Sequence, residues 1–303
     1  MSARQGGPVV PGRFALIDLA PWTDRAGRLS WLKLACFISA LLPACWLAYA
    51  YATDNLGTKP LTALNHETGL WATRFLAVTL AITPFRRIFA WPRLIVLRRQ
   101  LGLTVLAYSL IHVVIYVIDQ SLDLVFVLSE IVHRFYLGLG AIALVIFLVQ
   151  GATSNDGALK RLGAVRWNEI HRLIYPAILI VLLHFLLQSK LDVSEACLML
   201  GLFAALMLYR LAHDIGLPLK FPTLLCVAVL SGVLTMLTEA GWYASGGRIS
   251  FWLVLESNLD PLSTFRPGWW TFASAALVAV LAFARARFAE PERPARRHAP
   301  HRA

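Results

Sequence analysis

The sequence predicts an all-α integral membrane protein, with a six-helix bundle followed by two further C-terminal transmembrane helices. Of its 303 residues, 58% are hydrophobic and only 15% are charged, against roughly 45–50% and about 25% in soluble domains. A soluble fold cannot hide this excess, because apolar atoms already form roughly 55–60% of a soluble surface. The apolar residues also form continuous runs, which excludes the alternating strands of a membrane barrel and a disordered chain.

Eight apolar runs approach the length of about 20 residues that a membrane helix needs. Their expected ranges are 31–52, 69–85, 101–118, 135–151, 173–188, 196–211, 222–243 and 269–283. Short loops join the first six, and Gly216 and Pro218 separate them from the last two. We therefore expect four parts: an N-terminal segment over 1–28, a six-helix domain over 29–212, two additional helices over 213–288 and a disordered tail over 289–303.

The basic residues predict the orientation of these spans. With the N-terminus in the cytoplasm, most Lys and Arg fall in inner loops, as the positive-inside rule requires, and the outer loop 119–130 is acidic. Residues 1–28 lack the apolar core of a signal peptide, so both termini are expected in the cytoplasm. The same distribution explains the net charge of +11, so membrane lipid rather than nucleic acid is the expected partner.

Histidines inside two of the spans predict a cofactor site. His112 and His184 lie deep in the third and fifth spans, whereas His171 lies near the inner start of the fifth. An ionisable side chain at this depth is a functional candidate by default. At about 1.5 Å per residue, His112 and His184 differ in depth by roughly 4–5 Å, and His112 and His171 by about 15 Å. His112 and His184 can therefore face each other across the bundle.

Two imidazoles without neighbouring carboxylates or cysteines argue against a structural zinc or di-iron site. They fit the axial ligands of a haem. The absence of a Cys-x-x-Cys-His motif makes that haem non-covalent and b-type. For a single histidine, an interhelical hydrogen bond would be the simpler interpretation; two at matching depth favour ligation.

Four charged or aromatic residues are candidates for cofactor contacts, each with an alternative. Arg74, inside the second span, could pair with a haem propionate or extend toward the outer interface. Arg98 and Arg99, in the inner basic cluster, could hold a flavin phosphate or only set the topology. Trp167 could line an inner cofactor or quinone pocket, or anchor its helix at the interface.

Two further candidates lie near His112 or at the outer end of the second span. Tyr108 is one helical turn before His112 and could pack on the porphyrin or within the bundle. His66 opens the second span and could be a ligand or a residue of the helix entry. Neither alternative is decided by the sequence.

Several segments together resemble a known family over roughly residues 28–212. They are Leu41-Leu42-Pro43, His66-Glu67-Thr68-Gly69 with Ile82-Thr83-Pro84, Leu97-Arg98-Arg99-Gln100-Leu101-Gly102-Leu103, His112, and the stretch from Gly163 through Trp167, His171 and Tyr175 to His184. On these residues the chain resembles the MsrQ (YedZ) family of haem-binding membrane subunits. More widely, it is similar to the transmembrane domains of ferric reductases and NADPH oxidases.

The resemblance implies a non-catalytic electron-transfer subunit in the bacterial inner membrane. Such subunits carry electrons to a periplasmic molybdopterin protein, MsrP, which reduces methionine sulfoxide in oxidised periplasmic proteins. The electron donor implied is the quinone pool or a flavin reductase, and the cofactors implied are haem b and FMN. The expected fold is a ferric-reductase-like six-helix bundle.

The chain also departs from the wider family. Oxidase-type domains carry two histidines on each of two helices, whereas the third span here has only His112, with Arg98 and Arg99 near the second position. A second haem on His171 therefore lacks an obvious partner ligand and stays open. No soluble flavin domain follows the bundle, so a single-chain NADPH oxidase is not expected.

Two other functions remain as alternatives. One is a stand-alone membrane ferric or metal reductase. The other is a transporter with histidine proton relays, for which only Pro43 and Pro176 approach the midplane helix breaks of transporters.

Overall fold

A computed structural model describes residues 21–24, 27–190, 192–247, 249–260, 262 and 264–288. The described residues form helices and no strand, apart from an isolated bridge between Thr23 and Leu29. The prediction of an all-α membrane protein is confirmed. Most of the expected N-terminal segment and the whole expected tail, 289–303, lie outside the described residues.

Seven helical segments of the described chain are long and apolar enough to cross a membrane. They are α1 (Trp31–Ala52), η2 with α3 (Pro92–Leu97 and Arg98–Asp119), α5 (Phe135–Ala152), α6 with α7 (Asp156–Arg172 and Ile174–Gln188), α8 (Ser194–Asp214), α9 (Phe221–Ser245) and α11 (Pro267–Phe288). The chain is therefore a multi-pass membrane protein.

The expected span over 69–85 lies inside helix α2 (Pro60–Ile88). This helix has 29 residues, or about 43 Å at 1.5 Å per residue, which exceeds the roughly 30 Å of a bilayer core. It is not among the seven segments that are apolar enough to cross a membrane by composition, because charged side chains such as Glu67, Arg74 and Arg86 interrupt it.

Two short helices lie where the sequence suggested loops. α4 (Leu124–His133) occupies much of the expected outer loop, and α10 (Phe251–Leu259) precedes α11. Asp123 caps the N-terminus of α4: its carboxylate accepts a hydrogen bond of 2.9 Å from the backbone N–H of Phe126, which is a typical N-cap. Both helices are too short to span a bilayer.

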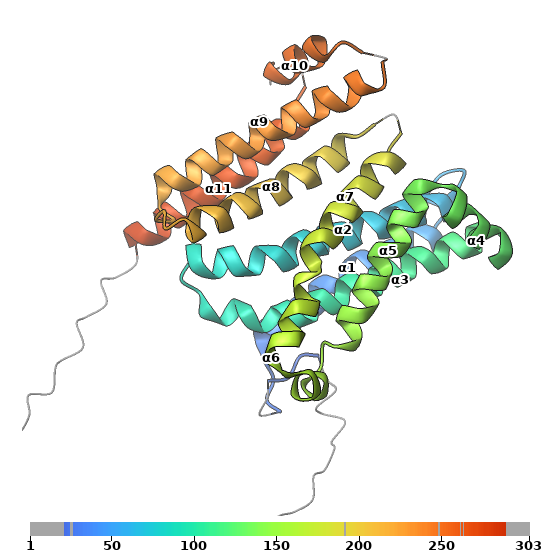
Figure 1. Cartoon of the computed structure of the whole chain (residues 1–303), viewed down its shortest axis with the longest axis horizontal. Helices are drawn as coiled ribbons and strands as arrows, with labels where there is room; N and C mark the ends of the chain where they lie inside the picture. The colour runs from blue at the N-terminus through green and yellow to red at the C-terminus, as the bar shows by residue number, and fades with distance from the viewer. Residues whose placement is uncertain are drawn as a thin grey trace, which may run out of the picture. The chain divides into compact units, whose positions relative to one another are not determined.

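The chain forms two compact units (Figure 1). The first contains residues up to Ile82 and from Arg93 to His184, so it holds α1, most of α2, and α3 to α7 up to His184. In this unit α3 packs against α1 and α5, and α4 packs against α5.

The second unit contains Thr83–Pro92 and the chain from Phe185 onward. Here α8 packs against both α9 and α11, and α10 packs against α9. The helix expected as the sixth span, α8, is grouped with the C-terminal helices by these contacts.

A buried ion pair joins α9 to the segment before α11 in this unit. Glu239 is fully buried, and its Oε1 lies 2.9 Å from Nη2 of Arg266. Its Oε2 accepts a hydrogen bond of 3.0 Å from Nδ2 of Asn258 on α10. Indole Nε1 of Trp269 in turn donates to the carbonyl oxygen of Asn258 at 2.7 Å.

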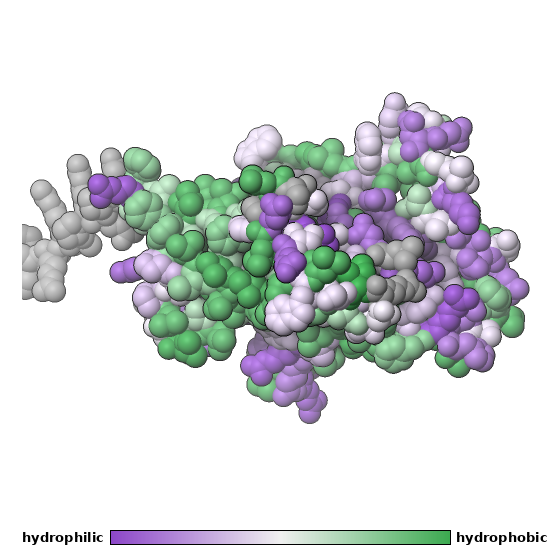
Figure 2. Space-filling model, turned by 90° about the horizontal axis from the view of Figure 1, so that it is seen from above, coloured by the Kyte–Doolittle hydropathy of each residue, from purple (hydrophilic) through white to green (hydrophobic). Residues whose placement is uncertain are grey.

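Large apolar side chains are exposed on many of the helices, among them Leu42, Trp46, Val145 and Leu179. Figure 2 shows hydrophobic side chains in broad continuous patches on the visible surface. In water such patches would promote aggregation. In a bilayer they face lipid, which is the environment that the composition predicts.

Candidate functional site

His112 lies on α3 and is held by α2. Its Nδ1 is 2.8 Å from the backbone carbonyl oxygen of Asn65. The side-chain Nδ2 of Asn65, a buried residue, donates a longer hydrogen bond of 3.4 Å to the carbonyl oxygen of His112. The two helices are therefore joined in both directions at the level of this imidazole.

His184 lies on α7 and is held by α5 in the same manner. Its Nδ1 is 2.7 Å from the backbone carbonyl oxygen of Tyr136. The ring of Tyr136 lies beside the imidazole, with 6.4 Å between the centroids. Two helix pairs, α2 with α3 and α5 with α7, thus each present one histidine in equivalent hydrogen bonding.

These contacts decide which nitrogen of each ring is free. A carbonyl oxygen only accepts, so Nδ1 must carry the proton, and Nε2 keeps its lone pair. Among the described residues no hydrogen-bond partner is found for Nε2 of His112 or of His184. The two residues are also close enough to interact electrostatically. This is the state of a metal-ligating histidine oriented by its second nitrogen.

The donor set also indicates which kind of metal group fits. In the described part of the chain, no three His, Cys, Asp or Glu side chains gather as ligands for a metal ion. A bare zinc or iron ion needs more protein ligands than two imidazoles supply. A haem brings four equatorial nitrogens and needs only the two axial ones, so the residues present fit a haem.

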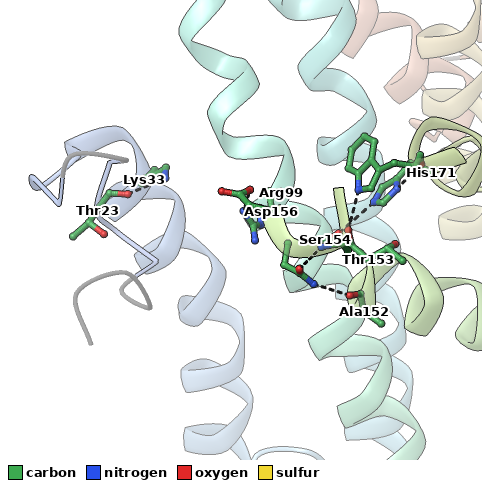
Figure 3. A network of polar contacts seen from close by, with 11 residues as sticks. Thr23, Lys33, Arg99, Ala152, Thr153, Ser154, Asp156 and His171 are labelled. Atoms are coloured by element: carbon green, nitrogen blue, oxygen red, sulfur yellow. Dashed lines mark hydrogen bonds and ion pairs between the residues drawn. The ribbon is translucent and has the colours of Figure 1, made fainter. Parts of the chain in front are cut away.

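His171 on α6 is held differently. Its Nδ1 lies 3.0 Å from the carbonyl oxygen of Trp167 one turn earlier, and its Nε2 lies 3.3 Å from Oγ of Ser154. The indole of Trp167 stacks on the imidazole at 3.8 Å and donates from Nε1 to the carbonyl oxygen of Thr153 at 2.9 Å. Figure 3 shows this network. Both ring nitrogens of His171 are therefore engaged within the protein.

Comparison with known proteins gives the family. Residues 68–182 match the family described as ferric reductase like transmembrane component. A protein-methionine-sulfoxide reductase haem-binding subunit MsrQ from Rhodospirillum rubrum is 35% identical over 189 residues, which cover 62% of this chain and 88% of the relative. This chain belongs to the MsrQ family. An MsrQ from Brucella ovis is 37% identical over 192 residues, covering 63% of this chain and 86% of the relative. No solved structure matches the chain.

Three other candidates of this MsrQ-family chain occupy different surroundings. The hydroxyl of Tyr108 donates to the carbonyl oxygen of Ala40 at 2.8 Å, so this buried side chain joins α3 to α1. The guanidinium of Arg74 lies over the ring of Trp71 on the same helix, 4.9 Å from its centroid. His66 is exposed on α2 and interacts electrostatically with His112.

The remaining candidates lie close to His171. Arg98 and Arg99 are exposed at the start of α3, and Arg98 is within electrostatic reach of His171. Nη1 of Arg99 forms an ion pair of 3.2 Å with Asp156 at the start of α6, also drawn in Figure 3. The structure therefore brings Arg98, Arg99, Trp167 and His171 together. None of these four residues takes part in the hydrogen bonds that hold His112 and His184.

Sequence reasoning missed the two residues whose carbonyls hold the histidines. Asn65 and Tyr136 accept from the imidazoles through backbone oxygens, so their residue types carry no signal for these contacts, although the amide of Asn65 also donates to the carbonyl oxygen of His112. A weaker signal was present in the glycines one helical turn later, Gly69 and Gly140, since glycine is unfavourable inside a helix.

Proposed function

We propose that this chain is a haem b electron-transfer subunit of the membrane, in which His112 and His184 would hold the haem iron. The observation that carries the proposal is the matched hydrogen bonding of the two imidazoles, which leaves both Nε2 lone pairs available. The relatives' name as haem-binding subunits supports it. When bound, the haem would supply the one-electron chemistry, and the protein would bind and tune it.

The chain's own residues would do three things in this function. The carbonyl oxygens of Asn65 and Tyr136 orient the two rings and fix their protons on Nδ1. Tyr108 fastens the ligand-bearing α3 to α1. The surrounding apolar helices exclude water, and burial of this kind is one of the levers that set a haem potential.

We further propose one haem per chain. A second haem on His171 would require the imidazole to leave Ser154, and its partner ligand is not provided by a histidine on α3. The residues around His171 instead suit the entry of electrons at the inner side, where the exposed Arg98 and Arg99 could receive an anionic flavin such as FMN or an acidic donor protein. Arg74 and His66 stay candidates for contacts to a haem propionate at the outer side.

The biological setting is the inner membrane, with both termini in the cytoplasm. Electrons from the quinone pool or a flavin reductase would pass to a periplasmic MsrP-like molybdopterin subunit that reduces methionine sulfoxide in damaged proteins. The excess of Lys and Arg in the inner loops supports the orientation. The relatives' membership of a methionine sulfoxide reductase system supports the class of partner.

The first experiment is a reduced-minus-oxidised visible spectrum of the detergent-purified chain, with a pyridine haemochrome assay for stoichiometry. We expect one haem b per chain, lost in His112→Ala and His184→Ala and retained in the control His171→Ala. Normal bis-histidine spectra in both ligand variants would refute the site. Two haems, one of them lost in His171→Ala, would refute the single-haem proposal.

A second experiment tests the direction and the partner. The chain is placed in vesicles and reduced from one side by a quinol or by a flavin reductase with FMN. Reoxidation by methionine sulfoxide only when a periplasmic molybdopterin subunit is added would support the proposal. Direct reoxidation by ferric chelates without that subunit would favour the stand-alone metal reductase.

A further inference from the structure

We propose that Gly69 and Gly140 are positioning residues, whose missing side chains allow the two histidines to reach the backbone carbonyls that set their protonation. The inference rests on the proposed haem function for its electronic consequence, but its geometry stands without it. Gly69 follows Asn65 by one helical turn on α2, and Gly140 follows Tyr136 by one turn on α5.

Each of these carbonyl oxygens accepts a hydrogen bond within its own helix and another from an imidazole. The carbonyl oxygen of Asn65 also lies 3.0 Å from Oγ1 of Thr68, but that hydroxyl is closer, at 2.8 Å, to the carbonyl oxygen of Leu64. Inside a helix, the carbonyl oxygen of one residue accepts the N–H of the residue four positions later. The carbonyl of Asn65 therefore pairs with the N–H of Gly69, and that of Tyr136 with the N–H of Gly140. A carbonyl oxygen has a second lone pair, but a side chain four residues later on the same face stands beside it. Glycine leaves that lone pair open to a neighbouring helix.

The distances show that an added side chain would meet the imidazoles themselves. A Cβ at Gly69 would lie 3.0 Å from both Cε1 and Nδ1 of His112. A Cβ at Gly140 would lie 3.0 Å from Cε1 and 3.2 Å from Nδ1 of His184. These separations are shorter than ordinary carbon contacts of about 3.5–4.0 Å. The ring must then move away, and the hydrogen bonds of 2.8 and 2.7 Å to the carbonyls would stretch.

Two other glycines, one on α3 and one on α5, lack this relation and serve as controls. A Cβ at Gly102 on α3 would have no neighbouring atom within 4 Å. A Cβ at Gly138 on α5, half a turn from Gly140, would meet only a backbone oxygen at 3.4 Å. Close approach to an imidazole thus occurs at the corresponding place in both helix pairs and not at these neighbouring glycines.

The hydrogen bond matters for the metal. An imidazole that donates from Nδ1 to a carbonyl is a more basic ligand at Nε2, and its ring orientation is fixed. A stronger donor favours the ferric state over the ferrous one. Loss of either hydrogen bond should therefore raise the midpoint potential and increase the high-spin fraction, since a misplaced ring ligates less firmly.

The first test needs no haem. The full-length chain is produced in a haem-deficient host, and the histidine tautomers are measured by NMR of isotope-labelled ring nitrogens, with assignments from His112→Ala and His184→Ala. We expect Nδ1-protonated signals for His112 and His184 in the wild-type chain. Gly69→Ala should lower the Nδ1-protonated fraction of His112 alone and Gly140→Ala that of His184 alone, while Gly102→Ala and Gly138→Ala change neither. Wild-type rings protonated at Nε2 would overturn the inference whether or not any variant folds.

The second test uses the haem-loaded chain and redox potentiometry with low-temperature electron paramagnetic resonance. The two glycine variants should show a higher midpoint potential and a larger high-spin signal than the two control variants. Unchanged potentials and spectra in both would overturn the role in tuning. A wild-type chain that takes up no haem would refute the proposed function, while the tautomer measurement would still decide the positioning role.

Discussion

Removing the counter-ion of Glu239 should strongly destabilise the second unit. In Arg266→Ala the fully buried carboxylate loses the guanidinium at 2.9 Å and keeps the amide of Asn258 at 3.0 Å. Breaking a buried pair by removing one partner costs about 3–5 kcal/mol. Because the side chain of Arg266 is 23% exposed, we expect a loss at the lower end of this range, about 3 kcal/mol. This corresponds to a roughly hundredfold increase in the equilibrium constant for opening of the unit.

A buried thiol in the same unit provides the assay. Cys197 on α8 is fully buried, whereas the other three described cysteines are at least partly accessible. With those three replaced by alanine, the rate at which a thiol reagent labels Cys197 reports opening of this unit. We expect Arg266→Ala to label about a hundred times faster than the parent chain under conditions where closing is faster than labelling.

Two controls separate this explanation from others. Arg287→Ala removes an exposed arginine near the end of α11 and should leave the labelling rate unchanged. The double variant Glu239→Leu with Arg266→Leu removes both charges and should recover much of the loss, because apolar replacement of a buried pair is often close to neutral. The reasoning would be refuted if Cys197 in Arg266→Ala were labelled at the rate of the parent chain. It would also be refuted if the double variant were labelled as fast as Arg266→Ala.

Three smaller changes test other contacts. Gly201→Ala places a Cβ against the hydroxyls of threonines on α9 and α11. Overpacking of this kind costs about 1–3 kcal/mol and should speed the labelling of Cys197. The control Gly241→Ala, with open space around the added Cβ, should leave the labelling rate unchanged. Asp123→Ala removes the N-cap of α4 and should loosen that helix by about 1 kcal/mol, seen as faster hydrogen exchange confined to it. Arg99→Ala breaks an exposed ion pair with Asp156, and its effect on thermal stability should stay below about 1 kcal/mol; a larger loss would mean that the pair holds α6 in place.

The fold class, and the position of two histidines inside apolar helices, could be predicted because both depend on hydrophobicity. Continuous apolar runs have few structural solutions in lipid, and an imidazole within such a run stands out. Short helices such as α4 and α10 could not be found in this way, since they lack the length that identifies a span. Loop lengths also do not reveal which helix faces pack together, so the grouping of α8 with α9 and α11 emerged only in three dimensions.

The sequence contains a signal for the buried ion pair of the second unit. Glu239 is a lone carboxylate within the seventh apolar run, and a charge at that position requires a partner. That partner is Arg266, which lies in the expected loop between the last two spans. By contrast, the acceptors of His112 and His184 had no signal in residue type, and only the coordinates of the backbone identify them.

The use of main-chain oxygens to hold both imidazoles has a consequence for how such proteins diverge. The two equivalent acceptor positions already carry unrelated side chains, an amide at Asn65 and a phenol at Tyr136. Substitution there leaves the carbonyl oxygen in place, although at Asn65 it would also remove the side-chain hydrogen bond to the carbonyl oxygen of His112. We therefore expect divergence to be limited mainly at each histidine and at a glycine in a different helix, where the glycine contributes only the absence of a side chain.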